Sequence, residues 1–92
     1  MAEAVHLRIK GRVQGVGYRA WLEHEATRAG LRGWVRNRTD GSVEALLVGT
    51  VEVIDRVVTA CATGPRLAAV TAVQRSAATD DGRSGFRQLP TE

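Results

Sequence analysis

The sequence predicts an α+β sandwich in which the elements follow the order β-α-β-β-α-β. Apolar residues alternate with polar ones in several short segments, as in half-buried strands, and recur at helical spacing in two others. A hairpin signal, Asp40-Gly41, lies between the second and third strand segments. We therefore expect a four-stranded antiparallel sheet with two helices on one face.

The first strand and the first helix flank a glycine-rich turn. Val5, Leu7 and Ile9 alternate with His6, Arg8 and Lys10, and this period of two indicates one buried face. After the turn, an apolar stripe is typical of an amphipathic helix. The stripe consists of Tyr18, Trp21, Leu22, Ala26 and Ala29. Gly30 follows it and is expected to end the helix.

The remaining segments follow in order. We expect strands over residues 33–37, 43–48 and 69–73, a helix over 51–61, a loop over 79–82 and a frayed end over 90–92. An extra C-terminal edge strand is possible over residues 85–89. Right-handed crossovers and the tight hairpin make this order a ferredoxin-like split βαβ sandwich, which we predict as a single domain over residues 1–92.

The composition narrows the classes of function. The chain has 92 residues, of which 43% are hydrophobic, with a net charge of +3 and a sequence pI of about 10.0. This charge suits an anionic ligand, but 4% aromatic residues are few for a base-stacking surface. A single cysteine fits a reducing compartment. Without an expected signal peptide or membrane helix, we predict a cytoplasmic protein.

The turn from Gly11 to Arg19 is the first candidate site. Its three glycines let the backbone bend and approach a ligand closely. Because a helix begins at its end, several amide groups lack intrahelical acceptors and can bind an anion. Arg19 lies at the same positive helix end, where a cation is unfavourable unless an anion binds beside it. We predict a phosphate-binding loop, and a plain strand-to-helix turn is the alternative.

Two other motif interpretations do not fit the chain. Residues 15–20 match the dinucleotide pattern G-x-G-x-x-A, but the ribose-binding carboxylate is missing and the chain is too short for a doubly wound sheet. The segment from Cys61 to Arg66 is one residue short of a C-x5-R phosphatase loop. Cys61 also lies on the apolar stripe of the second helix, so we expect a core cysteine.

The other polar candidates are isolated. His6 and His24 have no cluster of metal-binding residues near them in the sequence, so we expect no metal site. No Ser-His-Asp or paired-carboxylate arrangement is visible. Asn37 follows a short strand and can be a turn residue. Its amide also offers a donor and an acceptor, which can hold a water without acting as acid or base.

Two segments together resemble the acylphosphatase family. Residues 11–19, Gly-Arg-Val-Gln-Gly-Val-Gly-Tyr-Arg, resemble its G-x-V-Q-G-V-x-[FY]-R signature. Residues 33–37 and 40–44 resemble its second signature, G-[FYW]-[AV]-x-N followed by D-G-x-[VL]-E. Gly64-Pro65, followed by Val70 and Val73, is similar to the family pattern after the second helix. The resemblance covers about residues 5–75.

The resemblance implies a fold, an activity and a site. The family fold is the same ferredoxin-like sandwich, and its activity is hydrolysis of acyl phosphates to carboxylate and inorganic phosphate. Arg19 would be the phosphate-binding catalytic arginine, and Asn37 would hold the attacking water. The backbone amides of the loop would bind the phosphate, from Gln14, Gly15, Val16, Gly17, Tyr18 and Arg19.

The implied reaction also leads to predictions about cofactors and partners. The leaving group is a carboxylate, whose conjugate acid has a pKa of about 4, so no general acid, metal or cofactor is expected. We predict a monomer with a small-molecule substrate that binds neither nucleic acid nor membrane. The family usually ends in an aromatic-rich strand, whereas residues 77–85 here resemble a loop and 86–89 would have to form that strand.

Three alternatives remain open at this point. One is a non-catalytic module that binds an anion or nucleotide on the same fold. Another is a small RNA-binding domain, which is kept open by the basic residues Arg8, Lys10, Arg12, Arg32, Arg36 and Arg38. A third is a domain like those at the front of larger carbamoyl-transfer proteins, although we expect a small free-standing acylphosphatase.

Overall fold

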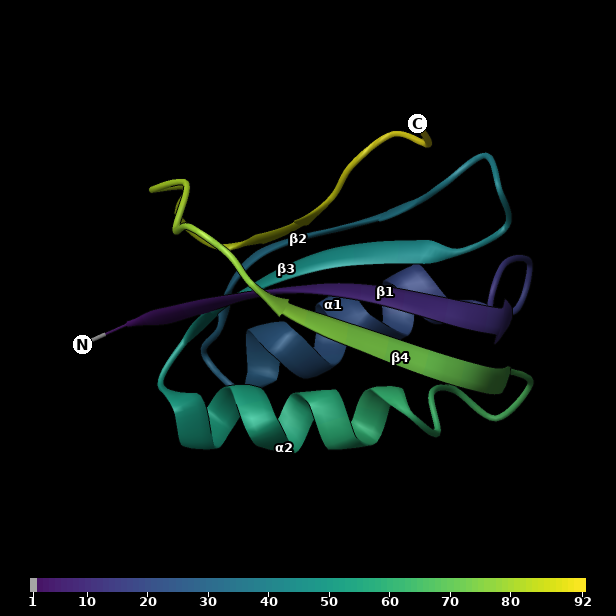
Figure 1. Cartoon of the computed structure of the whole chain (residues 1–92), viewed down its shortest axis with the longest axis horizontal. Helices are drawn as coiled ribbons and strands as arrows, with labels where there is room; N and C mark the ends of the chain where they lie inside the picture. Colours follow the sequence, from purple (N-terminus) through teal and green to yellow (C-terminus); the bar gives the residue numbers. More distant parts are fainter. Residues whose placement is uncertain (1) are drawn as a thin grey trace.

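The predicted order of elements is confirmed in the computed structural model, which describes residues 2–92. The elements are β1 (Glu3–Arg12), α1 (Tyr18–Arg28), β2 (Arg32–Asn37), β3 (Val43–Gly49), α2 (Val51–Cys61), β4 (Ala69–Ala77) and β5 (Phe86–Gln88). Both helices lie on the same side of one sheet, as Figure 1 shows. The fold is the ferredoxin-like α+β sandwich that the sequence predicts.

The sheet order places the ends of two strands together. The five strands are arranged β4-β1-β3-β2-β5, and β3 is antiparallel to both of its neighbours, β1 and β2. Strands β1 and β2 therefore run in the same direction, on either side of β3. Ile9 and Asn37 both pair with Val43. The C-terminal ends of β1 and β2 therefore lie at the same end of the sheet, and Asn37 lies close to the glycine-rich turn that follows β1.

The core lies between the helices and one face of the sheet. Alternate residues of β1 and β3 point into it, and the fully buried ones include Leu7, Ile9 and Leu47. Helix α1 contributes Tyr18, Leu22 and Ala26, and α2 contributes Ile54, Val57 and Cys61. Cys61 is fully buried, as expected for a core cysteine.

The C-terminal end differs from the expectation. The predicted fraying of residues 90–92 is wrong, because the Glu92 amide donates to the Asn37 carbonyl (3.1 Å) and the Thr39 amide donates to the Glu92 carbonyl (3.2 Å). The edge strand that was only possible from the sequence is present as β5, which pairs parallel to β2. Residues 86–92 thus cover the outer edge of β2 with hydrogen bonds that would otherwise be unmade.

Two strands are longer than predicted. Strand β1 reaches from Glu3 to Arg12, and β4 continues to Ala77 instead of ending at Val73. These two strands pair with each other over most of their length. Each strand extends beyond its segment of alternating apolar residues because its partner is also long. This pairing explains the extra length of both β1 and β4.

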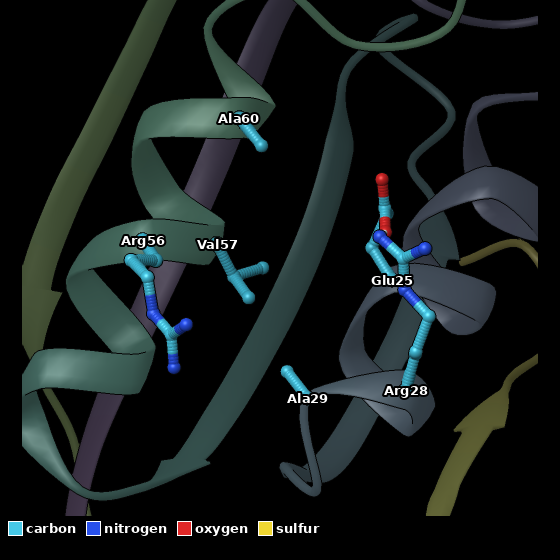
Figure 2. Close-up of a pocket in the computed structure, with 6 residues that line it drawn as sticks. All are labelled: Glu25, Arg28, Ala29, Arg56, Val57 and Ala60. Carbon is cyan, nitrogen blue, oxygen red and sulfur yellow. The ribbon is translucent and has the colours of Figure 1, made fainter.

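The two helices leave a groove of about 400 Å³ between them (Figure 2). Glu25, Arg28 and Ala29 face it from α1, and Arg56, Val57 and Ala60 from α2. None of the residues predicted for the site lines this groove. In the described part of the chain, no helix has the length and apolar character needed to cross a membrane.

Candidate active site

The turn between β1 and α1 has the backbone conformation of an anion-binding loop. Gly15 and Gly17 have φ angles of 72° and 80°, in the left-handed region that favours glycine. The space where each Cβ would lie is open to 4 Å, so a ligand can approach the backbone there. No side chain of residues 2–92 caps α1, and its first turn carries no acid. Its first amide groups therefore stay available to an anion.

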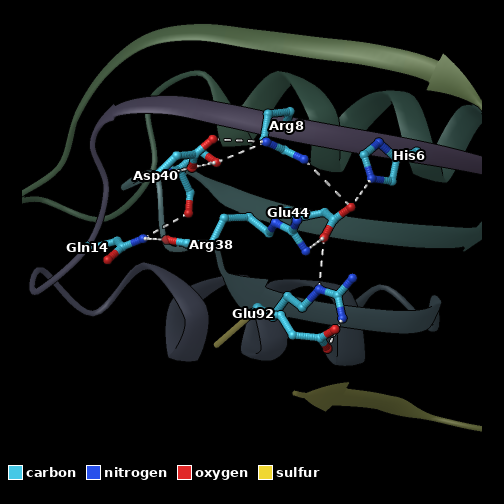
Figure 3. Close-up of polar contacts among 9 residues, drawn as sticks. His6, Arg8, Gln14, Arg38, Asp40, Glu44 and Glu92 are labelled. Carbon is cyan, nitrogen blue, oxygen red and sulfur yellow. Dashed lines mark hydrogen bonds and ion pairs between the residues drawn. The ribbon is translucent and has the colours of Figure 1, made fainter. Parts of the chain in front are cut away.

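Gln14 fastens this loop to the β2–β3 hairpin. Its Nε2 donates to the carbonyl oxygens of Arg38 (2.7 Å) and Ser42 (2.9 Å), as Figure 3 shows in part. These two carbonyls flank the hairpin turn, and the Arg38 amide donates to the Ser42 carbonyl at 2.8 Å. The side chain of Gln14 thus holds the loop against the strand that ends in Asn37, a role that the sequence did not reveal.

Glu44 lies among basic side chains on the sheet face that the helices do not cover (Figure 3). Its side chain is 11% exposed and contacts His6 Nε2 (2.5 Å), Arg36 Nε (2.8 Å), Arg38 Nη1 (3.4 Å) and Arg8 Nη2 (3.9 Å). Burial raises the pKa of Glu44, but the hydrogen bonds from His6 and Arg36 outweigh it and hold the pKa below the ordinary value. Each of the three arginines therefore already has a carboxylate partner within the protein.

Arg19 differs from the other half-buried arginines. Arg8, Arg32, Arg36 and Arg38 each have a carboxylate within 4.0 Å. Arg19 is also half-buried but has no such partner among residues 2–92. An unpaired cation at the positive end of a helix is unfavourable on its own. An external anion would supply the missing charge.

Asn37 carries an unpaired polar atom at the end of β2. Its Oδ1 is buried and has no hydrogen-bond partner within the described part of the chain. Its backbone is fixed by pairing with Val43 and by the bond from the Glu92 amide. Since nearly all buried polar atoms are paired, an unpaired amide oxygen marks a position for a water or a ligand donor.

A single hollow of about 150 Å³ brings these groups together. It is lined by Val13, Gln14, Gly15, Gly17, Tyr18, Arg19, Ala20, Asn37 and Gln88. A water occupies about 30 Å³ in the liquid, so the hollow has room for a small anion and a water. It is the place where the loop, the unpaired guanidinium and the unpaired amide oxygen meet.

The acylphosphatase family model matches residues 5–88 of this chain. The chain belongs to the acylphosphatase family. It is 51% identical over 85 residues to an acylphosphatase of Azoarcus sp. (strain BH72), an alignment that covers 92% of this chain and 87% of that one. The match to the family model continues past residue 75, where the resemblance noted from the sequence ends, and it includes β5.

Solved structures agree with this assignment. An acylphosphatase from Coxiella burnetii superposes with a TM-score of 0.92 at 31% identity, over 96% of this chain and 93% of that chain. An acylphosphatase from Bacillus subtilis has a TM-score of 0.91 at 33% identity, over 97% and 99%. The acylphosphatase fold therefore extends over nearly all of the described residues.

Most of the loop residues predicted from the acylphosphatase signature line the hollow. Gln14, Gly15, Gly17, Tyr18 and Arg19 do so, whereas the Val16 side chain packs against the core. The Tyr18 hydroxyl points away from the hollow and donates to the Cys61 carbonyl at 2.7 Å. Burial raises the pKa of Tyr18, and the neighbouring Cys61 raises it further. Tyr18 is thus a buried anchor for α1 in this acylphosphatase fold.

Sequence reasoning missed Gln88. The residue lies on β5, lines the hollow beside Arg19 and Asn37, and donates from Nε2 to Glu23 Oε1 at 2.9 Å. It lies outside both acylphosphatase signatures, on a strand of three residues that shows no clear alternation. The one available sign was an uncharged polar residue in the segment that replaces the usual aromatic-rich end.

The other candidates have structural partners. His6 contacts Glu44, and His24 is exposed on α1. Within residues 2–92, no three His, Cys, Asp or Glu side chains are grouped so that they could hold a metal ion. On the open face of the sheet, the Arg36 guanidinium lies over Trp34, 4.9 Å from the ring centroid. That contact partly occupies the ring that an RNA base would need.

Proposed function

We propose that this chain hydrolyses the carboxyl–phosphate bond of acyl phosphates by in-line attack of water on phosphorus. The reaction is RCOOPO3²⁻ + H2O → RCOO⁻ + H2PO4⁻. The observation that carries the proposal is the meeting of the amide loop, Arg19 and the unpaired Asn37 amide oxygen in one hollow. Membership of the acylphosphatase family supports the same reaction.

The loop and Arg19 bind the phosphoryl group. Amide groups at the start of α1 donate to its oxygens, and the guanidinium donates two further, parallel hydrogen bonds. In phosphoryl transfer, charge is spread over the equatorial oxygens in the transition state. Fixed donors around those oxygens stabilise that charge without reorganising. Among residues 2–92 Arg19 has no carboxylate partner, which leaves it free for this role.

Asn37 positions the attacking water. Its buried Oδ1 accepts a hydrogen bond from the water, which orients the oxygen lone pair toward phosphorus. Holding a nucleophile in the reactive geometry lowers the barrier because its freedom is lost before the reaction begins. Strand β2 is bonded on both sides, by β3 and by the C-terminal residues, and so fixes the backbone of Asn37.

No group in the hollow needs to donate a proton to the leaving group. A carboxylate leaves as a stable anion because its conjugate acid has a pKa of about 4. The proton of the water goes to a phosphoryl oxygen of the substrate, which gives H2PO4⁻. This chemistry needs neither a histidine nor a carboxylate beside the phosphate, in keeping with the residues that line the hollow.

Hydrolysis of benzoyl phosphate with and without a chelator tests the proposal. We expect turnover that EDTA leaves unchanged. Arg19→Ala should reduce kcat/KM by about 10²–10³-fold, the usual effect of removing one transition-state donor. Arg56→Ala is the matched control, because Arg56 is an exposed arginine of α2 away from the hollow. Phosphate binding without hydrolysis would instead support the non-catalytic anion-binding module.

The single domain, the monomeric state and the cytoplasmic location stay predictions from the sequence. We infer a monomer, because Val51 and Leu67 are the only large hydrophobic side chains that residues 2–92 leave exposed. Light scattering coupled to size exclusion tests this. A dimer that dissociates together with the loss of turnover would contradict it.

A further inference from the structure

Gln88 connects β5 to the helix that carries Arg19. Its Nε2 donates to Glu23 Oε1 at 2.9 Å, a contact between residues 65 positions apart. Within β5, Gln88 alone lines the hollow. The residue therefore touches the phosphate site on one side and a carboxylate of α1 on the other.

Glu23 is the natural internal partner of Arg19. The two residues lie four positions apart on α1, so they are neighbours on one face of the helix. A pair with the cation first is the weaker of the two orders but still attractive. On the same helix Glu25 and Arg28 do form an ion pair, at 2.9 Å. Glu23 and Arg19 form none within 4.0 Å.

A carboxylate on Arg19 would compete with the substrate. The phosphoryl group and a side-chain carboxylate are both oxyanions, and a guanidinium binds either one with the same two donors. If Glu23 occupied Arg19, each phosphate would have to displace it. Gln88 engages Glu23 with a neutral amide, which adds no charge to the site and no second cation that could bind phosphate.

We propose that Gln88 is a positioning residue that holds Glu23 away from Arg19 and so keeps the guanidinium available to the phosphoryl group. The inference rests on the proposed function, because it assigns Gln88 a part in binding the same substrate. It predicts that the identity of residue 88 changes phosphate affinity through Glu23 and not through contact with the reacting atoms.

The variant Gln88→Leu tests this role, since it removes the donor and retains a similar side-chain size. We expect the KM for benzoyl phosphate and the Ki for inorganic phosphate to rise by about two- to fivefold, the range that a partly exposed ion pair is worth. The kcat should stay within about twofold, because Asn37 and the loop are unchanged. Thermal unfolding confirms that the variant is folded.

The second variant separates positioning from packing. In the Glu23→Gln background no carboxylate can reach Arg19, so Gln88→Leu should then leave both KM and Ki unchanged. Arg28→Ala, which breaks the Glu25 pair on the same helix, should also leave both unchanged. A normal Ki in Gln88→Leu, or a defect that persists in the Glu23→Gln background, would overturn the proposal.

Failure of the proposed hydrolase function can be distinguished from failure of the positioning role of Gln88. If the wild-type chain does not hydrolyse benzoyl phosphate, titration calorimetry with inorganic phosphate still measures the effect of Gln88→Leu on affinity. A loss of affinity that Glu23→Gln removes would then support the positioning role without catalysis. No phosphate binding by the wild-type chain would overturn both proposals.

Discussion

The variant Asn37→Ala separates catalysis from binding at this site. The side chain is proposed to hold the attacking water, while the loop and Arg19 hold the phosphate. Removing the amide should therefore reduce kcat for benzoyl phosphate by about 10²-fold or more, the effect expected of a misplaced reactant. The Ki for inorganic phosphate should stay within about twofold.

The same variant has an expected effect on stability. Oδ1 of Asn37 is buried without a partner among the described residues, and an unpaired buried acceptor costs about 1–3 kcal/mol. A bound water offsets part of that cost, so we expect the free energy of unfolding to rise by up to about 1 kcal/mol. In a domain of this size, 1 kcal/mol corresponds to about 4–8 °C in Tm.

Steady-state kinetics and a thermal unfolding curve measured on one preparation give both values. Gln74→Ala is the matched control, because it removes an exposed side-chain amide from β4. Near-native turnover in Asn37→Ala would refute the water-positioning role. A fall in Tm of more than about 8 °C would show that the amide serves mainly to hold the end of β2 together.

Three further predictions concern the scaffold. Tyr18→Phe removes the hydrogen bond to the Cys61 carbonyl and should lower the free energy of unfolding by about 1–2 kcal/mol in thermal unfolding. Burial raises the pKa of the Cys61 thiol to about 11, so iodoacetamide at pH 8 should label it only in unfolded protein. Hydrogen bonds from His6 and Arg36 outweigh burial and lower the folded pKa of Glu44. Its stabilisation is therefore complete above the unfolded pKa of about 4.3. It is lost as pH falls through the folded value, and Glu44→Gln should flatten this acid limb of a Tm-against-pH curve.

Local sequence patterns predicted the features that depend on residues close together in the chain, namely the loop, the helices and the hairpin. The glycine spacing and the apolar stripe of α1 predicted the loop and the start of the helix. The Asp40-Gly41 turn predicted that β2 pairs with β3. These pairings bring Asn37 to the loop, because β1 and β2 flank β3 in the same direction. The acylphosphatase signatures named the same residues.

Contacts between distant segments were not predictable in this way. Strand β5 has three residues, too few to show a period, and its position depends on an edge of β2 that only the folded sheet offers. The bond between Gln88 and Glu23 follows from that position. The side-chain role of Gln14 also stayed hidden, since its partners are backbone carbonyls of the hairpin, which no sequence motif records.

The short strand β5 also bears on how the protein behaves at high concentration. An uncovered strand edge offers unpaired amide and carbonyl groups on which a second chain can add. Here β2 is protected by three residues of β5 and the hydrogen bonds of the segment after it. Detachment of that segment would expose β2 while most of the core remained packed. Resistance to self-association should therefore depend on the last seven residues more than on the melting temperature of the whole chain.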